Sequence, residues 1–218
     1  MSDRWYAGFG ALCVLASLAL FGALHVLPPT AELDWSRRTI SQYALTENGW
    51  AFDAGTLLLA AGSAAVLVLL VRVGLVGRGP GGTAAAIALV LWIAGLVGVV
   101  GFEKHDWAVG QSMSGDIHRV ASVVAFVSLP AGALLAAVPR IGETGARLVV
   151  AGAVAALICF LPIVWAFVSE PWTGVRWWRA IPLGGVERLL GLAEVVTVML
   201  LAWWAAAKAR AVHVGAAG

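Results

Sequence analysis

The sequence predicts an all-α protein, a polytopic bundle of about six transmembrane helices. Apolar residues (A, V, I, L, M, F, W, Y and C) make up 61% of the 218 residues, and charged residues make up 12%. Soluble domains carry about 25% charged residues, and a small soluble globule cannot bury this much apolar surface. The apolar residues also collect in segments of about 20 residues, which is the length that a helix needs to cross a bilayer.

Six segments have this length, and we expect the whole chain, 1–218, to form a single transmembrane domain. They cover residues 7–27, 51–73, 84–102, 117–138, 147–168 and 186–207. The first segment exceeds the apolar part of a signal peptide, which is about 7–15 residues long, so we expect an uncleaved span. The fifth contains Pro162, which a membrane helix tolerates as a kink.

The connections between these segments predict the orientation of the chain. Two are short and rich in glycine (74–83 and 139–146), and three are longer (28–50, 103–116 and 169–185). The side with the short connections and both termini has seven Lys and Arg residues, against five in the loops of the other side. Arg119 and Arg188 stand at helix starts and are assigned to the bundle. Positive residues favour the cytoplasm, so we expect both termini there.

Charge and cysteine usage exclude several classes of protein. The formal net charge is +2, without the basic run that a nucleic-acid partner requires. Cys13 and Cys159 fall inside apolar segments and have no C-x-x-C partner. They are interpreted as buried thiols, not as redox or zinc ligands. The expected partners are membrane lipids.

Polar side chains gather at one level of the predicted bundle, at or just inside the end with the long connections. This set comprises His25, Ser41, Asp53, Asp106, Asp116, His118, Arg119, Glu187 and Arg188. We expect the connections to fold over the bundle and enclose a polar cavity there. Most of these residues also have an ordinary structural role: Asp53 and Asp116 can cap helix starts, Ser41 can close a turn, the arginines can reach lipid headgroups, and the histidines can serve as hydrogen-bonding groups.

Glu194 lies deeper, about eight residues into the last segment and so roughly 12 Å below its start. A carboxylate at that depth is costly unless it is protonated or paired. Glu187, Gly191, Glu194 and Thr197 share one helix face. We therefore expect Glu194 to line the cavity or to pair with a cation, for which Arg119 is the candidate.

Three hypotheses for the site follow. The first is a binding cavity for a lipid headgroup or small solute, with Asp106, Asp116, Arg119, Glu187, Arg188 and Glu194 as candidate ligand-binding residues. The second is a membrane hydrolase or lipid-modifying enzyme. Its nucleophile is Ser41 or a metal-bound water, and its base is His118, oriented by Asp53 or Asp116. The third is a haem or metal site with His25 and His118 as ligands. No motif such as G-x-S-x-G decides among them, so enzyme status, cofactor and oligomeric state stay open.

Four stretches carry a resemblance to a known family. They are RRTISQYALTENGWAFDAG, FEKHDW, SGDIHRVASVVAF and GGVERLLGLAE, in that order along the chain. From about residue 7 to 207 the chain resembles the bacterial and archaeal membrane family catalogued as domain of unknown function 998. The resemblance implies six helices in a prokaryotic cytoplasmic membrane, and it implies no reaction. It suggests that the positions that matter are Ser41, Asp53, Asp106, His118, Glu187 and Arg188.

Overall fold

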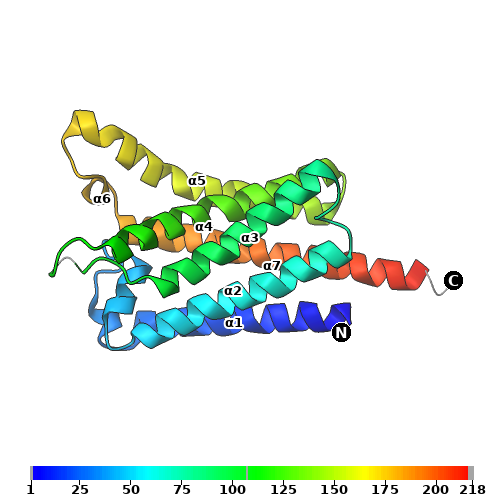
Figure 1. Ribbon diagram of the computed structural model, residues 1–218, viewed down its shortest axis with the longest axis horizontal. Coiled ribbons are helices and arrows are strands. Elements are labelled where there is room, and N and C mark those ends of the chain that lie inside the picture. Colours follow the sequence, from blue (N-terminus) through cyan, green and yellow to red (C-terminus); the bar gives the residue numbers. More distant parts are fainter. Residues whose placement is uncertain (1, 107, 216–218) are drawn as a thin grey trace.

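The computed structural model describes residues 2–106 and 108–215, which form an all-α bundle with no strand among them. The long helices are α1 (Asp3–Val26), α2 (Gly49–Arg72), α3 (Gly79–Gly101), α4 (Met113–Ala137), α5 (Thr144–Thr173) and α7 (Leu183–Gly215) (Figure 1). The short ones are η1 (Thr30–Glu32), η2 (Ile40–Leu45), η3 (Val138–Arg140) and α6 (Trp177–Ala180). Six helices are long and apolar enough to cross a membrane. The predicted fold class is confirmed, and the protein is an integral membrane protein.

Several helices are longer than the apolar segments that predicted them. α3 begins at Gly79 rather than at residue 84, because Pro80 in its first turn needs no hydrogen-bond partner for its nitrogen. α5 continues beyond the expected residue 168 and ends at Thr173, because the next residue, Gly174, has a left-handed φ of 67°. The hydrophobic pattern marks the part of a helix that lies in lipid, whereas capping residues set where the helix begins and ends.

The helices pack mainly in sequential pairs, with α7 against several of them. α1 packs on α2, α3 on α4, and α5 on α7, while α7 also contacts α1, α2 and α4. Small residues allow the closest approaches: a Cβ atom on Gly62 would lie 3.0 Å from the carbonyl oxygen of Gly10, and one on Gly95 would lie 2.8 Å from that of Ala121. Such contacts replace the hydrophobic effect as the source of helix association in lipid.

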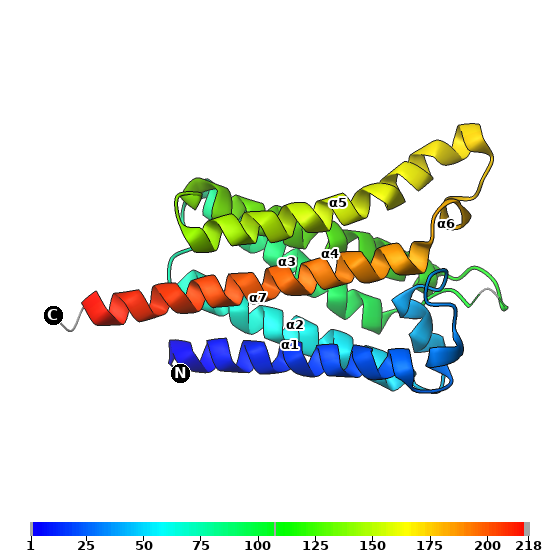
Figure 2. The same ribbon diagram turned by 180° about the vertical axis from the view of Figure 1, so that it is seen from behind.

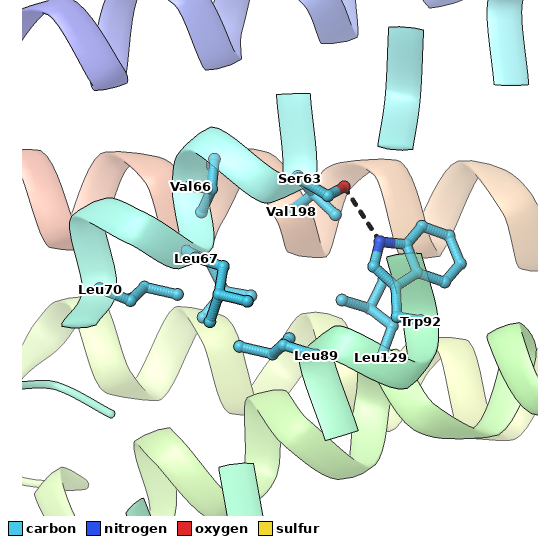
Figure 3. A pocket seen from close by; sticks show the side chains of 9 residues that line it. Ser63, Val66, Leu67, Leu70, Leu89, Trp92, Leu129 and Val198 are labelled. Atoms are coloured by element: carbon cyan, nitrogen blue, oxygen red, sulfur yellow. Dashed lines mark hydrogen bonds between the residues drawn. The ribbon is translucent and has the colours of Figure 1, made fainter. Parts of the chain in front are cut away.

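The middle of the bundle is closely packed. Trp92 of α3 is 2% exposed, and its indole Nε1 donates to the Ser63 hydroxyl of α2 at 3.0 Å (Figure 3). This bond accounts for a tryptophan far from either membrane interface. The void beside it measures about 10 Å³, with Leu89 and Val198 among its lining residues. That volume holds at most about one water, so this void is too small for a ligand.

The two ends of the bundle differ. Both termini lie at one end, together with the short connections, and the three long connections lie at the other (Figures 1 and 2). Near these long connections the C-terminal part of α5 diverges from the bundle in both views, and α6 leads the chain back to α7. α5 contains Pro162 and Pro171, and its apolar window is the least buried of the six. We call the end with the long connections the site end.

Gly184 allows the connection between α1 and α2 to lie directly on the start of α7. A Cβ atom there would lie 2.3 Å from the carbonyl oxygen of Arg38 and 2.6 Å from that of Trp35.

We expect Gly184→Ala to displace this connection and to lower the free energy of unfolding by roughly 1–3 kcal/mol, measured as thermal unfolding in detergent. Gly191→Ala on the same helix is the control, since its Cβ atom meets nothing within 4 Å. Equal losses in both variants would contradict this role of Gly184.

Candidate functional site

Arg188 holds the connection between α1 and α2 over the start of α7. Its Nε donates to His25 Nε2 at 2.7 Å, and its Nη2 donates to the Tyr43 hydroxyl at 2.7 Å. Its Nη1 reaches three backbone carbonyls at 2.7–2.9 Å, those of Trp35, Arg38 and Gly184. Only a guanidinium has enough N–H groups in a fixed plane to serve all of these acceptors. Arg188 therefore determines where η2 lies.

A cavity of about 340 Å³ opens at the site end, between η2, the connection after α3, and helices α4 to α7. Its charged and polar wall consists of Arg37, Arg38, Thr39, Ser41, Gln42, Lys104, His105, His118, Arg119, Ser122 and Glu187. Its apolar wall consists of Val123, Phe126, Phe160, Ile163, Trp177, Trp178 and Leu183, with Gly115 completing the lining. The cavity thus has a polar side and an apolar side.

The polar wall is strongly cationic. It contains four Lys and Arg side chains and one carboxylate, that of Glu187. Arg119 is exposed and makes no hydrogen bond or ion pair of its side chain with the residues that the structure describes. A concave, partly desolvated surface of one sign concentrates ions of the opposite sign. This arrangement suits an anionic group.

Ser41 and Lys104 form a close pair on the polar wall. The Lys104 ammonium donates to the Ser41 hydroxyl at 2.8 Å and also to the Thr39 hydroxyl, and the two hydroxyl oxygens lie 3.3 Å apart. Burial lowers the pKa of Lys104 below its ordinary value. The nearby carboxylate of Glu187 acts to raise this pKa, and the charges of Arg119 and Arg38 act to lower it.

Two cavity residues each have a buried polar atom without a hydrogen-bond partner among the described residues. The backbone N–H groups of Ile40 and Ser41 approach the Glu187 carboxylate, but its Oε2 is buried and unbonded. His118 donates from Nδ1 to the Phe102 carbonyl at 2.9 Å, so its unbonded Nε2 is an acceptor. Buried polar atoms normally have partners, and these two acceptors are available to a donor group on a ligand.

The structure does not bring the expected hydrolase residues into one hydrogen-bonded set among the described residues. Asp116 lies 3.3 Å from His105 rather than beside His118. Asp53 lies in the second turn of α2, because that helix begins at Gly49, and the neighbouring charge that acts on it is the like charge of Glu103, which repels it. Of the expected set, Ser41 and His118 do line one cavity, but the basic group bonded to Ser41 is Lys104.

The two histidines proposed for haem also lie apart. His25 belongs to α1, where its Nδ1 donates to the Phe21 carbonyl at 2.6 Å and its Nε2 accepts from Arg188. It does not line the cavity that contains His118. Within the ranges 2–106 and 108–215, no group of three or more His, Cys, Asp or Glu side chains is placed to hold a metal ion.

Of the six candidate ligand-binding residues, Arg119 and Glu187 line the cavity and the others do not. The donors of Arg188 are used by the protein itself. Asp106 forms an exposed turn, accepting from the Ala108 N–H at 2.9 Å, and Asp116 faces solvent. Glu194 is 1% exposed, and no ion pair joins it to Arg119 or to another described cation. The expected Arg119 partner is thus corrected.

Sequence reasoning missed several residues of the cavity. Lys104 is the main one, followed by Arg37, Arg38, Thr39 and the pair Trp177 and Trp178. A usable signal existed for Lys104, since the chain has only two lysines beside its twelve arginines, and this one stands between Glu103 and His105. The sequence predicted that the connections fold over the bundle, but it did not indicate that residues 37–42 are the part of the first connection that lines the cavity.

Together, the fold and the site define a class, an integral membrane protein with six spanning helices and an amphipathic cavity at one end. The chain belongs to the family described as "Protein of unknown function (DUF998)", whose model matches residues 11–204. This confirms the resemblance carried by the four sequence stretches. No curated protein and no solved structure matches the chain.

Substitution of Glu194 by glutamine tests whether the bundle interior contains an ion pair. A buried carboxylate without a cation is stable only in its neutral form, and Gln has nearly the same shape. We expect Glu194→Gln to change the free energy of unfolding by less than about 1.5 kcal/mol, measured by thermal unfolding in detergent. A loss of roughly 3–5 kcal/mol, partly restored by adding Arg119→Gln, would instead reveal the ion pair.

Proposed function

We propose that the protein binds the anionic headgroup of a membrane lipid in the cavity at the site end. The observation that carries this proposal is the division of one cavity into a cationic wall and an apolar wall. A soluble anion would need only the first, and an apolar molecule would need only the second. A lipid with a phosphate or carboxylate in its headgroup uses both.

The dimensions of the cavity support this ligand class. Its volume of about 340 Å³ falls in the range of roughly 300–1,000 Å³ that small-molecule sites occupy. That is enough for a headgroup and the first part of an acyl chain. The chain itself would continue along the apolar wall, where Phe126 of α4 and Phe160 of α5 lie with ring centroids 6.3 Å apart.

The cations of the wall support an anionic headgroup. Arginine presents paired N–H donors that match two oxygens of a phosphate or carboxylate. Arg119 is free to do so, whereas Arg37 already donates to the carbonyls of Arg179 and Ile181 at 3.3 and 3.4 Å. Arg38 is also exposed, and its guanidinium makes no hydrogen bond with a residue that the structure describes, so Arg119 and Arg38 are the residues whose removal should weaken binding most directly.

We also propose an orientation, with both termini in the cytoplasm of a prokaryotic cell and the site end at the outer face of the cytoplasmic membrane. It rests on seven Lys and Arg residues on the side of the termini against five in the loops of the site end. Arg119 and Arg188, which would make the two counts equal, are left out because they belong to the starts of α4 and α7. The two ends of the bundle are well separated (Figure 1), so the cavity would take its ligand from the outer leaflet.

Cysteine labelling tests this orientation. In a chain with Cys13 and Cys159 replaced by alanine, we expect Val109→Cys to react with a membrane-impermeant maleimide in intact cells. Gly81→Cys should react only after the cells are lysed. Val109 is 89% exposed in the connection after α3, and a Cβ atom on Gly81 of α3 meets open space. Labelling of Gly81→Cys alone in intact cells would invert the orientation.

Binding is tested with three probes on the purified protein in detergent. We expect dihexanoyl phosphatidic acid to raise the melting temperature and to bind by calorimetry, and dihexanoyl phosphatidylcholine to bind more weakly, because its headgroup carries no net charge. Arg119→Gln should weaken binding of the acid about tenfold, or about 1.4 kcal/mol. Arg210→Gln, on an exposed residue of the last helix outside the cavity lining, is the matched control.

The third probe, inorganic phosphate, shows whether the ligand is a lipid or a free anion. Binding of phosphate as tight as that of phosphatidic acid would make the ligand a solute and would overturn the role of the apolar wall. Binding of none of the three probes, or equal binding by Arg119→Gln, would overturn the proposal as a whole.

A further inference from the structure

A site that only binds an anion needs cationic side chains, and it does not need a serine hydroxyl bonded to a partly buried lysine amine, as Ser41 and Lys104 provide. We propose that Ser41 is a nucleophile and Lys104 its general base, so that the cavity cleaves or transfers an ester-linked acyl group of the amphiphile it binds. The inference rests on the proposed binding function for the way in which the substrate is held. It adds a reaction class and two catalytic residues.

The geometry meets the requirement for an activated serine. The Lys104 Nζ lies 2.8 Å from the Ser41 Oγ, within the 2.6–3.2 Å over which a base takes a proton from a nucleophile. A third group orients the base, since Lys104 also contacts the Thr39 hydroxyl. Serine with lysine is an established variant of the serine–histidine arrangement, and both residues line the cavity.

A lysine can act as a base only when its amine is neutral. Burial lowers the pKa of Lys104, and Arg119 of α4 and Arg38 of the first connection lower it further by repelling its charge. Glu187 of α7 opposes them by attraction. His118 of α4 and His105, which follows Lys104 in the connection after α3, also line the cavity. The same cations that disfavour the ammonium would stabilise the oxyanion of an acyl-transfer step.

The proposed reaction needs only the ester substrate and water. Ser41 Oγ attacks the ester carbonyl carbon and forms a bond to it, while its proton passes to the Lys104 amine. The bond between that carbon and the leaving oxygen then breaks, and Lys104 returns the proton to the departing alcohol. Lys104 then takes a proton from water as the water oxygen attacks the carbonyl carbon of the acyl-serine. The bond between that carbon and Ser41 Oγ breaks, the carboxylic acid leaves, and Lys104 returns the proton to Ser41 Oγ.

Lys104 could instead serve only to hold η2 in place, and one substitution separates the two roles. Lys104→Arg keeps a donor for the hydroxyls of Ser41 and Thr39, but an arginine does not give up its proton. The chain contains one other lysine, Lys208, whose Nζ donates to Glu143 Oε1 at 2.8 Å at the opposite end of the bundle. Lys208→Arg is therefore the matched control.

The probe is a decyl fluorophosphonate, which reacts with activated serines by forming a phosphorus–oxygen bond and releasing fluoride. With the protein in phosphatidylcholine nanodiscs, we expect one adduct, located on Ser41 by peptide mass spectrometry. Its rate of formation should rise from neutral to alkaline pH as Lys104 loses its proton. Ser41→Ala should give no adduct, and Lys104→Arg should react at least about tenfold more slowly at equal melting temperature. Lys208→Arg should react at the wild-type rate, and so should Ser128→Ala, since Ser128 of α4 does not line the cavity.

The outcomes distinguish this inference from the binding function. If the wild-type protein binds dihexanoyl phosphatidic acid but forms no adduct on Ser41 at alkaline pH, the nucleophile is overturned and the binding site stands. Equal labelling of Lys104→Arg and wild type would overturn Lys104 as the base. A rate of adduct formation on the wild-type protein that does not change with pH would also overturn Lys104 as the base. This measurement needs no variant, so it remains decisive even if a variant misfolds. If the wild-type protein neither forms the adduct nor binds lipid, the proposed binding function is overturned as well.

Discussion

The hydrogen bonds of Arg188 are the interaction on which the site end depends. This one side chain joins α7 to His25 of α1, to the hydroxyl of Tyr43 in η2, and to carbonyls of the connection between them. Irregular backbone near a membrane needs partners for its polar groups, because lipid provides none. The guanidinium supplies them, and the absence of a side chain at Gly184 lets the connection come close enough to be reached. η2 then lies over the bundle and presents Ser41 to Lys104.

The cavity follows from the way in which the helices are connected. The middle of the bundle is filled by small residues and by Trp92, whereas at the site end α5 diverges from its neighbours and α6 returns the chain (Figure 2). Polar residues of the connections close one side of the resulting space, and aromatic residues of α4 to α6 close the other. Cations are tolerated at this level because it lies near the membrane surface, where burial of a charge is less costly than at the centre. The amphipathic character of the cavity is thus a consequence of its depth.

The sequence predicted at which end of the bundle the site lies better than it predicted which residues form the site. Span length placed His118, Arg119 and Glu187 at one end, because depth follows from counting residues along a helix, and Ser41 was placed there because its connection joins two spans at that end. They did not reveal which polar groups would be used by the protein itself. Arg188 and His25 bond to each other, 163 residues apart in sequence, and so neither remains for a ligand. Lys104 was missed because its partner, Ser41, stands 63 residues away in a connection without regular periodicity.

By itself the sequence determined the fold class, the six spanning helices and the family. Hydrophobicity acts locally and adds up along a segment, so a run of apolar residues specifies a membrane helix without reference to the rest of the chain. The tertiary structure alone decided which cation stands beside Ser41, that Glu194 lies in the interior without an ion pair to any residue that the structure describes, and that α5 leaves room for a cavity. These features depend on distances between residues of different helices and connections. Such distances arise only when the helices have packed and Arg188 has fixed the backbone between them.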